Sequence, residues 1–518
     1  MTLLQRYNGM DTIATFDLWQ DFKTRLGSNS EVATVEQYNL ELALYTPSLF
    51  AMTRGFLVDK DAVTALRTQF EAENKALEAL LDTITRSLGL GVINMASYVH
   101  KQWLFECLSV KVPSKYDPKI GKSRPTTDRD ALEKISKQHP DLTPICNIII
   151  AYQNRAKMLT VLQPELTDKD GRMRTGYKIS GTVTDRWSSG KNCLWTGMNM
   201  QNVKRDEDEN KVGHASIRSA FIADPGKKLL NIDLKGADTW AIALEIFLYT
   251  GDDSLLKMLQ AGDVHTQVAK MIWPNLGWTG DKRADRKIAE QFFYLQYDYR
   301  FMCKKGGHGT NYYGSAAALA MQMKIPRHFA ENFQHKYFRA VPGLRPWQHE
   351  TIKELQTTGR LVNLFGRERC FHGRLDDNKV HKEAIGWKGQ SVTAGVINRA
   401  LLAMFNLQQT RPKLGLEFLA QVHDSYTGQF EQTAEAEMLS LCEPAMAVPI
   451  TVISRATGEI LTISIPIEIS TGWNWAKATN YNPDGLREYT GTVDVRTRQK
   501  TPKLQKPRFL DRRVSGVY

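Results

Sequence analysis

Two aspartates that are far apart in the chain, Asp233 and Asp424, each stand beside a strand-like apolar run. Asp233 follows the run at 228–232, and Asp424 falls at the turn of a strand–turn–strand pattern at 416–430. Mg²⁺ prefers carboxylate oxygens, and two such ions about 3.5–4 Å apart can activate a hydroxyl and neutralise a leaving pyrophosphate. Either aspartate alone could instead cap a following helix. As a pair they are candidates for two-metal phosphoryl transfer.

Four further candidates are spaced by four residues: Arg300, Lys304, His308 and Tyr312. On an α-helix each lies about 40° round from the last, so together they form a stripe about 18 Å long. The two cations could hold a triphosphate, and the two rings could meet a base and a sugar. A solvated basic face beside a core tyrosine would show the same spacing. Three glycines in this run each weaken a helix by about 1 kcal/mol and predict a moving or broken element: Gly306, Gly307 and Gly309.

The elements that must position these residues are mostly helical. Helical periodicity is found in these segments: 1–27, 34–54, 60–88, 128–163, 239–250 and much of 254–355. Short extended segments are expected at 55–59, 228–232 and within 416–430, and the segment 176–205 is irregular or strand-like. The mixture indicates an α+β protein.

Two segments are basic without apolar periodicity. The segment 110–127 is rich in Lys, Pro, Ser and Thr and is expected to be a mobile loop, and the chain from Tyr481 onward is expected to be a disordered tail. Both could contact phosphates, although a charge run is often only a solvated surface. The chain carries 68 Lys and Arg against 56 Asp and Glu, a net charge of +12 that suits a polyanionic partner.

Composition excludes several classes of protein. The 518 residues allow several domains, and 42% hydrophobic with 24% charged residues is typical of a globular protein. The six cysteines form no CxxC pair, which argues against a zinc site or a disulfide framework and suits a reducing cytoplasm. No apolar run approaches the roughly 18 residues of a membrane span, and the N-terminus does not resemble a signal peptide. We expect an intracellular protein of the cytoplasm.

The motifs resemble, in order, those of family-A DNA polymerases, the bacterial DNA polymerase I type. The resemblance covers about residues 1–478. Its strongest parts are LLNIDLKGAD from Leu229, RFMCKKGGHGTNYYG from Arg300 and QVHDS from Gln421. Weaker parts are TRGFLVDKDAV, RPTTDRDALEKI, GTVTDRWSS, NMQNV, IRSAFIADPG, LVNLFGRER and QSVTAGVIN. The resemblance implies template-directed DNA synthesis, in which dNTPs extend the 3′ end of a primer during DNA replication.

The resemblance also implies roles for individual residues. The carboxylates of Asp233 and Asp424, with the carbonyl of Leu234, would bind two Mg²⁺ ions, for which Mn²⁺ can substitute. Lys304 would be catalytic as well, protonating the leaving pyrophosphate. The dNTP would meet six side chains: Arg300, Lys304, His308, Tyr312, His265 and Asp238. The primer–template DNA would meet four: Arg186, Gln390, His423 and Asn202.

Several positions depart from the family pattern. Asp238 stands where glutamate is usual beneath the sugar, and it is one methylene shorter, which predicts looser exclusion of ribonucleotides. His308 stands where Phe or Tyr is usual, and Ser425 stands where a glutamate follows the second aspartate. Lys235-Gly236 replace the common Ser-Gln. The fingers motif ends in Tyr-Gly, whereas here Tyr313 intervenes before Gly314, and Tyr313 is a weaker hinge candidate than Tyr312.

At the N-terminus, Tyr7 and Asp11 resemble the last motif of a 3′–5′ exonuclease. That chemistry needs further carboxylates upstream, so we expect no complete exonuclease in this chain. Proofreading would be absent or supplied by a separate exonuclease, and a processivity subunit is a further possible partner. No membrane contact is expected. Such a polymerase suggests a phage or mobile-element replicase.

The implied fold is a right hand with an antiparallel-sheet palm, helical fingers and a helical thumb. The expected parts are an exonuclease remnant at 1–27, the start of the palm at 28–58, the thumb at 59–165, the palm with Asp233 at 166–240, the fingers at 241–394, the palm with Asp424 at 395–478 and the basic tail at 479–518. Two rival functions remain. A single-subunit RNA polymerase has a similar palm, and a non-catalytic DNA-binding scaffold could descend from a polymerase.

Overall fold

A computed structural model describes residues 3–28, 32–117, 120–192, 196–203, 216–294, 297–490 and 496–497. Helices and antiparallel sheets are both extensive, so the prediction of an α+β fold is confirmed. Cys193, residues 118–119 of the predicted basic loop and most of the predicted tail beyond residue 490 lie outside these ranges. Among the described residues, no helix combines the length and the apolar character needed to cross a membrane.

A five-stranded antiparallel sheet lies at the centre, with the strand order β13-β14-β8-β17-β18. Its strands are β8 (Lys227–Leu234), β13 (Glu417–Val422), β14 (Ser425–Glu431), β17 (Ile467–Gly472) and β18 (Arg487–Glu488). Successive residues of β8 face opposite sides. Leu230, Ile232 and Leu234 join the largest apolar core, whereas Leu229 joins a second core. The sheet is therefore held by apolar packing on both faces.

Long helices cover the face that carries Leu230 and Ile232. Those packed here are α2 (Val32–Arg54), α7 (Ala237–Thr250), α15 (Asn378–Thr410) and α16 (Glu435–Met446). Helix α7 is apolar almost all round and nearly wholly buried, and it begins after Gly236 and ends at Gly251, both in the left-handed conformation. It links β8 directly to the helices that follow.

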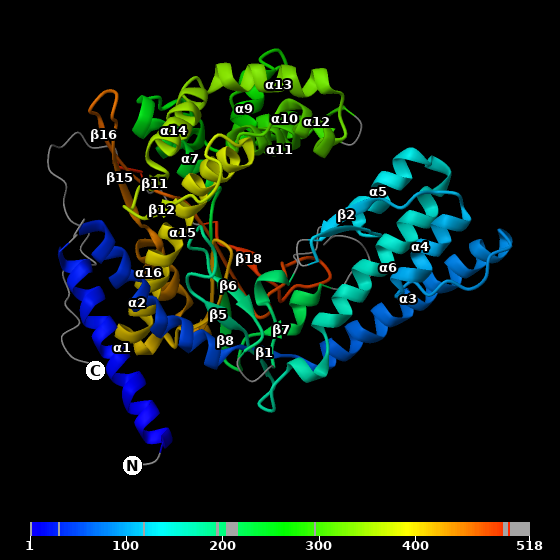
Figure 1. Cartoon of the computed structure of the whole chain (residues 1–518), viewed down its shortest axis with the longest axis horizontal. Coiled ribbons are helices and arrows are strands. Elements are labelled where there is room, and N and C mark those ends of the chain that lie inside the picture. Colours follow the sequence, from blue (N-terminus) through cyan, green and yellow to red (C-terminus); the bar gives the residue numbers. More distant parts are fainter. Residues whose placement is uncertain are drawn as a thin grey trace.

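A group of helices rises above one side of the sheet (Figure 1). It comprises α8 (Ser254–Ala261), α9 (Val264–Ile272), α10 (Lys282–Ala289), α11 (Tyr299–Asn311), α12 (Ala316–Met323), α13 (Arg327–Ala340) and α14 (Leu344–Thr358), with the short pair β9 (Phe292–Tyr294) and β10 (Tyr297–Asp298). Asp298 caps α11 by accepting a hydrogen bond from the N–H of Phe301. The stripe from Arg300 therefore lies on a helix, as predicted.

The glycines of α11 do not break the helix, so that part of the prediction was wrong. A Cβ at Gly306 would lie 2.6 Å from the ring of Phe333, and one at Gly307 would lie 3.2 Å from the ring of Tyr337. Both rings belong to α13. The glycines allow α13 to pack closely against α11, which periodicity alone does not reveal.

A second helical group lies on the other side of the sheet (Figure 1). It contains α3 (Lys60–Ser87), α4 (Tyr98–Cys107), β2 (Ser114–Asp117), β3 (Lys122–Pro125), α5 (Arg129–Gln138) and α6 (Thr143–Val161), around an apolar core of its own. The predicted mobile loop at 110–127 is instead largely the β2–β3 hairpin. Lys324, directly after α12 in the first helical group, donates from Nζ to Glu133 of α5 at 2.9 Å, so the two helical groups are in contact.

The remaining elements are short or peripheral. They are α1 (Leu3–Ser28), β1 (Phe56–Val58), β4 (Arg172–Met173), β5 (Gly176–Lys178), β6 (Ser188–Gly190), β7 (Phe221–Ile222), β11 (Arg360–Val362), β12 (Glu368–Cys370), β15 (Pro449–Ile453), β16 (Ile460–Ser464) and β19 (Arg496–Thr497). The predicted tail at 479–518 begins too early. Strand β18 belongs to the central sheet, and Lys477 forms a bridge with Leu486.

Candidate functional site

Asp233 and Asp424 lie on neighbouring strands of the central sheet. Asp233 of β8 is in register with Ser425 of β14, the residue directly after Asp424. The N–H of Leu234 donates to the carbonyl of Asp424 at 3.2 Å. Residues that are almost two hundred positions apart are thus adjacent, and both carboxylates are partly buried. The strands that carry the two candidate aspartates are therefore neighbours in the sheet.

The turn that carries Asp424 is a strained two-residue hairpin. Val422 pairs with Ser425, and His423 between them has φ 59°, which is uncommon for a residue other than glycine. The hydroxyl of Ser425 donates to the carbonyl of Val422 at 2.8 Å. The side-chain amide of Gln421 donates to the carbonyl of His423. These bonds hold the backbone of the turn on both sides of Asp424.

A polar network beneath this turn escaped the sequence analysis. The amide of Gln201 donates to Oε1 of Gln421 at 2.9 Å, and the hydroxyl of Tyr177 donates to the carbonyl of Gln421 at 3.0 Å. Gln421 and Tyr177 are buried, so losing either partner would leave polar groups unsatisfied. The neighbouring Asn202, which we predicted to contact DNA, is exposed.

The electrostatics around Asp424 suit a cation. Burial raises the pKa of Asp424, and the negative charge of Asp238 raises it further, against the opposing influence of Arg186 and His423. A divalent ion would relieve this repulsion, and carboxylates are hard oxygen ligands that suit Mg²⁺. In the described ranges no group of three His, Cys, Asp or Glu side chains forms a metal site.

Asp238, in the first turn of α7, is the centre of a hydrogen-bonded group. Its Oδ1 accepts hydrogen bonds from Arg186 at 2.8 Å and from the hydroxyl of Thr393 at 2.9 Å. Its charge, after burial, is the largest influence that raises the pKa of Tyr312. Thr393 lies on α15 and was not predicted, because nothing in its local sequence marks it. Asp238 thus connects α7, α11, α15 and the loop before β6.

The loop that presents Arg186 is fixed on both sides. The N–H of Arg186 donates to the hydroxyl of Thr182 at 3.1 Å, and Trp187 is buried with its ring edge-on to Tyr177. Asp185 has φ 64° and is buried, and burial raises its pKa to about 6 although Arg367 lies 3.1 Å away. Arg186 is therefore held in place by residues on both sides of it.

Helices α9 and α11 bring the predicted phosphate contacts together. Arg300 donates two hydrogen bonds to Asp263, at 2.8 and 2.9 Å. Burial opposes ionisation of Asp263, but the bonds from Arg300 and Thr266 lower its pKa to about 2. Burial, and then the charges of Arg300, Lys304 and His308, lower the pKa of His265 to about 4 despite Asp263. His265 is therefore neutral at pH 7 in a cationic surrounding.

The two rings of the stripe lie at the end of α11 nearer Asp238. The ring centroids of His308 and Tyr312 are 4.7 Å apart at 60°. A Cβ added to Gly389 of α15 would lie 3.3 Å from the hydroxyl of Tyr312, and one added to Gly386 would lie 3.7 Å from its ring. The Tyr312 ring therefore rests on a surface of α15 that lacks side chains.

Two further predicted residues lie on α15 and α11. Gln390 is partly buried on α15, next to Gly389, and Lys304 is exposed on α11. Lys235 binds Glu468 of β17 at 2.9 Å, and Glu468 is in register with Asp233. The negative charge of Glu468, next to Asp233, is therefore partly neutralised by Lys235.

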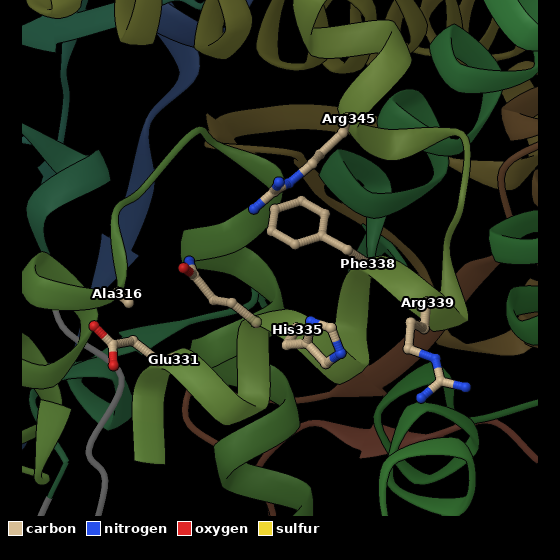
Figure 2. A pocket seen from close by; sticks show the side chains of 7 residues that line it. Ala316, Glu331, His335, Phe338, Arg339 and Arg345 are labelled. Atoms are coloured by element: carbon tan, nitrogen blue, oxygen red, sulfur yellow. The ribbon is translucent and has the colours of Figure 1, made fainter. Parts of the chain in front are cut away.

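A separate cavity of about 460 Å³ lies among α12, α13 and α14. Figure 2 shows its lining, in which the guanidinium of Arg345 lies over the ring of Phe338, 4.1 Å from its centroid. His335 and Arg339 add nitrogen donors, and Glu331 adds a carboxylate. None of these residues belongs to the group around Asp233, Asp238 and Asp424, so this cavity is not the candidate site.

Comparison with known proteins shows which family this chain resembles. The model of a family described as DNA polymerase family A matches residues 60–477. DNA polymerase I of Treponema pallidum is 26% identical over 484 residues, which cover 91% of this chain and 43% of that protein. The thermostable DNA polymerase I of Thermus aquaticus is 24% identical over 372 residues, which cover 70% and 40%. The chain thus spans less than half the length of these relatives.

A solved structure shares the fold. The "POL domain of Pol1 from M. smegmatis complex with DNA primer-template and dNTP" superposes with a TM-score of 0.66 at 21% identity, over 84% of this chain and 70% of that one. Because the family model covers most of the sequence, this chain belongs to DNA polymerase family A.

Proposed function

We propose that this chain is a DNA-directed DNA polymerase that adds deoxynucleotides from dNTPs to the 3′ end of a primer, as a DNA template directs, in DNA replication. The observation that carries the proposal is the adjacency of Asp233 and Asp424 across β8 and β14. Asp238 and Arg186 connect that pair electrostatically to His308 of α11. Nucleotide addition needs paired carboxylates for metal ions and cationic side chains for the triphosphate, and the proposal assigns these roles to the aspartates and to α11.

The proposed reaction joins the primer 3′ oxygen to the α-phosphorus of the dNTP and releases pyrophosphate. Asp233 and Asp424, with the carbonyl of Leu234, would hold two Mg²⁺ ions, or Mn²⁺ in their place. When bound, these ions lower the pKa of the primer hydroxyl and neutralise charge on the phosphates. The repulsion at Asp424 and the hard oxygen ligands support this assignment.

The protein's own side chains would bind and orient the substrates. Arg300 and Lys304 would hold the triphosphate, and Lys304 would donate a proton to the leaving pyrophosphate. His265, neutral at pH 7, would donate one hydrogen bond to a phosphate oxygen. His308 and Tyr312 would contact the base and sugar, with Asp238 beneath the sugar. Four residues would contact the primer–template DNA: Arg186, Gln390, His423 and Asn202.

This function assigns the parts of the fold to a right hand. The central sheet would be the palm, formed by residues 28–58, 166–240 and 395–478. Residues 241–394 would be the fingers, and residues 59–165 would be the thumb. The hairpin β2–β3 carries the exposed Lys115 and Arg124, which would face the duplex.

Primer extension on a template of defined sequence tests the proposal. With Mg²⁺ and four dNTPs, the product should be complementary to the template, and changing one template base should change the dNTP required. Four rNTPs alone should extend the primer poorly. Efficient synthesis from rNTPs alone would indicate an RNA polymerase. No extension with either set, together with retained DNA binding, would indicate a non-catalytic scaffold.

A further inference from the structure

The last turn of α11 ends at a tyrosine in a conformation that glycine usually occupies. The N–H of Tyr313 donates to the carbonyl of Thr310 at 3.2 Å, and the N–H of Gly314 donates to the carbonyl of Gly309 at 2.8 Å. This pair of bonds is the Schellman motif, whose left-handed residue is usually glycine because a Cβ is crowded there. Here that residue is Tyr313, with φ 60°. A bulky residue in this conformation is strained.

Gly314, the glycine that the family pattern would place in that role, meets a different requirement. It is absent from the residues with positive φ, but a Cβ on it would lie 2.6 Å from the carbonyl oxygen of Gly309. Gly314 therefore permits the close approach of two backbone segments. Tyr313 therefore adopts the left-handed conformation. Contacts of its ring must offset the backbone strain of that conformation.

On one side, buried amides fix the end of α11 to α13 and α14. Nε2 of Gln348 donates to the carbonyls of Thr310 and Asn311 at 3.0 and 3.1 Å. Nε2 of Gln334 donates to the carbonyl of Gly314 at 2.7 Å. Both amides are nearly inaccessible to water, so these bonds are costly to break. The end of α11 therefore moves with α13 and α14.

On the other side, two successive rings contact α15. Tyr312 rests on Gly386 and Gly389, as described above. Tyr313 meets the ring of His381 edge-on, with the centroids 6.5 Å apart at 75°. His381 lies in the first turns of α15, where its Nε2 is 2.9 Å from the carbonyl oxygen of Leu375. The joint between α11 and α15 thus depends on aromatic contacts.

We propose that Tyr313 is a positioning residue for dNTP binding, and this rests on the proposed polymerase function. Its ring, seated against His381, holds the end of α11 on α15 and so keeps Tyr312 on Gly386 and Gly389, close to Asp238. The chain is then preorganised for the incoming dNTP. Because apparent affinity falls with the fraction of molecules in the competent state, losing this contact weakens dNTP binding while saturating dNTP restores the geometry.

The variant Tyr313→Gly tests the ring alone: it removes the ring, and glycine accepts φ 60° without strain, so the backbone can keep its conformation. We expect the KM for dNTP to rise about tenfold, kcat to change less than about twofold, and the melting temperature to stay level or rise. Tyr313→Phe keeps the ring and should retain the wild-type KM. His381→Ala should raise the KM as Tyr313→Gly does, and the double variant should be no worse than either single one.

An unchanged KM in Tyr313→Gly would overturn the proposal. A rise in KM matched by an equal fall in kcat, together with a lower melting temperature, would also overturn it. A raised KM in Tyr313→Phe, or additive effects on KM in the double variant, would do the same. Hydrogen exchange without DNA or dNTP provides a test independent of activity. Amides at the end of α11 should exchange faster in Tyr313→Gly and His381→Ala but not in Tyr313→Phe, and unchanged exchange counts against the proposal. Absence of primer extension by the wild-type chain would instead refute the polymerase function.

Discussion

The guanidinium of Arg186 donates to Oδ1 of Asp238 at 2.8 Å, joining the loop before β6 to the first turn of α7. The same oxygen accepts a hydrogen bond from Thr393 of α15. Asp238 is therefore held at the point where three elements meet, between the paired aspartates and the rings of α11. If Asp238 lies beneath the sugar as proposed, the length of this side chain would set how much room remains there.

The first prediction concerns that room. Asp238 is one methylene shorter than the glutamate of the family pattern, so a 2′-hydroxyl meets less steric exclusion. We expect Asp238→Glu to raise the preference for dNTP over rNTP about tenfold, which corresponds to roughly 1.4 kcal/mol. The measurement is kcat/KM for matched dNTP and rNTP. Asp376→Glu, on an exposed loop, is the control. A wild-type preference equal to that of a glutamate-bearing relative would contradict the prediction.

The second prediction concerns acid stability and His265. Burial and nearby cations lower the pKa of His265 from its ordinary 6.5 to about 4. The unfolded chain therefore binds more protons between these values, so this contribution to stability is present above pH 6.5 and is lost as the pH falls toward 4. Between pH 7 and 4.5, the free energy of unfolding should fall about 1–2 kcal/mol more in the wild type than in His265→Gln. Urea unfolding at both values measures this, and equal losses would show that His265 titrates normally.

The third prediction separates two glycines of α11. In Gly306→Ala the new Cβ would lie 2.6 Å from the Phe333 ring, and the required shift should destabilise the protein by about 1–3 kcal/mol. In Gly309→Ala the nearest atom, on Leu319, is 3.6 Å away, so the better helix propensity of alanine should stabilise by about 0.5–1 kcal/mol. Denaturant unfolding of the matched pair measures both. Equal effects would mean that packing does not explain Gly306.

The fourth prediction concerns proofreading. Tyr7 and Asp11 are exposed on α1, and they resemble only the last motif of a 3′–5′ exonuclease. Two-metal hydrolysis needs several carboxylates around one phosphate, so this chain alone should not shorten a mismatched primer in Mg²⁺. A 3′-labelled mismatched primer incubated without dNTPs measures trimming. Trimming that disappears in Asp11→Ala would contradict the prediction.

The strands and the helix that hold the main candidate residues could be predicted from local sequence. Asp233 and Asp424 follow apolar runs whose lengths are those of strands, and the hairpin between 416 and 430 forms as predicted. The four-residue spacing from Arg300 to Tyr312 places that stripe on one helix. These features depend on neighbours in sequence, so periodicity reveals them.

Other features depend on partners that are remote in sequence. The amide of Gln201 donates a hydrogen bond to Gln421, 220 positions away in the sequence, and Thr393 donates one to Asp238, 155 positions away. No local pattern marks such polar residues. The β2–β3 hairpin was mistaken for a loop because its residues are almost all exposed, so neither strand alternates apolar with polar. The left-handed backbone of Tyr313 is likewise visible only in three dimensions.

The central claim is that Asp233 and Asp424 act together on one pair of metal ions. Single-turnover incorporation of one dNTP, measured across a Mg²⁺ titration, tests it most directly. We predict that Asp233→Asn and Asp424→Asn each slow incorporation by roughly 10³-fold, that the double variant is little slower than either, and that Asp376→Asn matches the wild type. Incorporation at near wild-type rate in Asp424→Asn, or losses that multiply in the double variant, would contradict the claim.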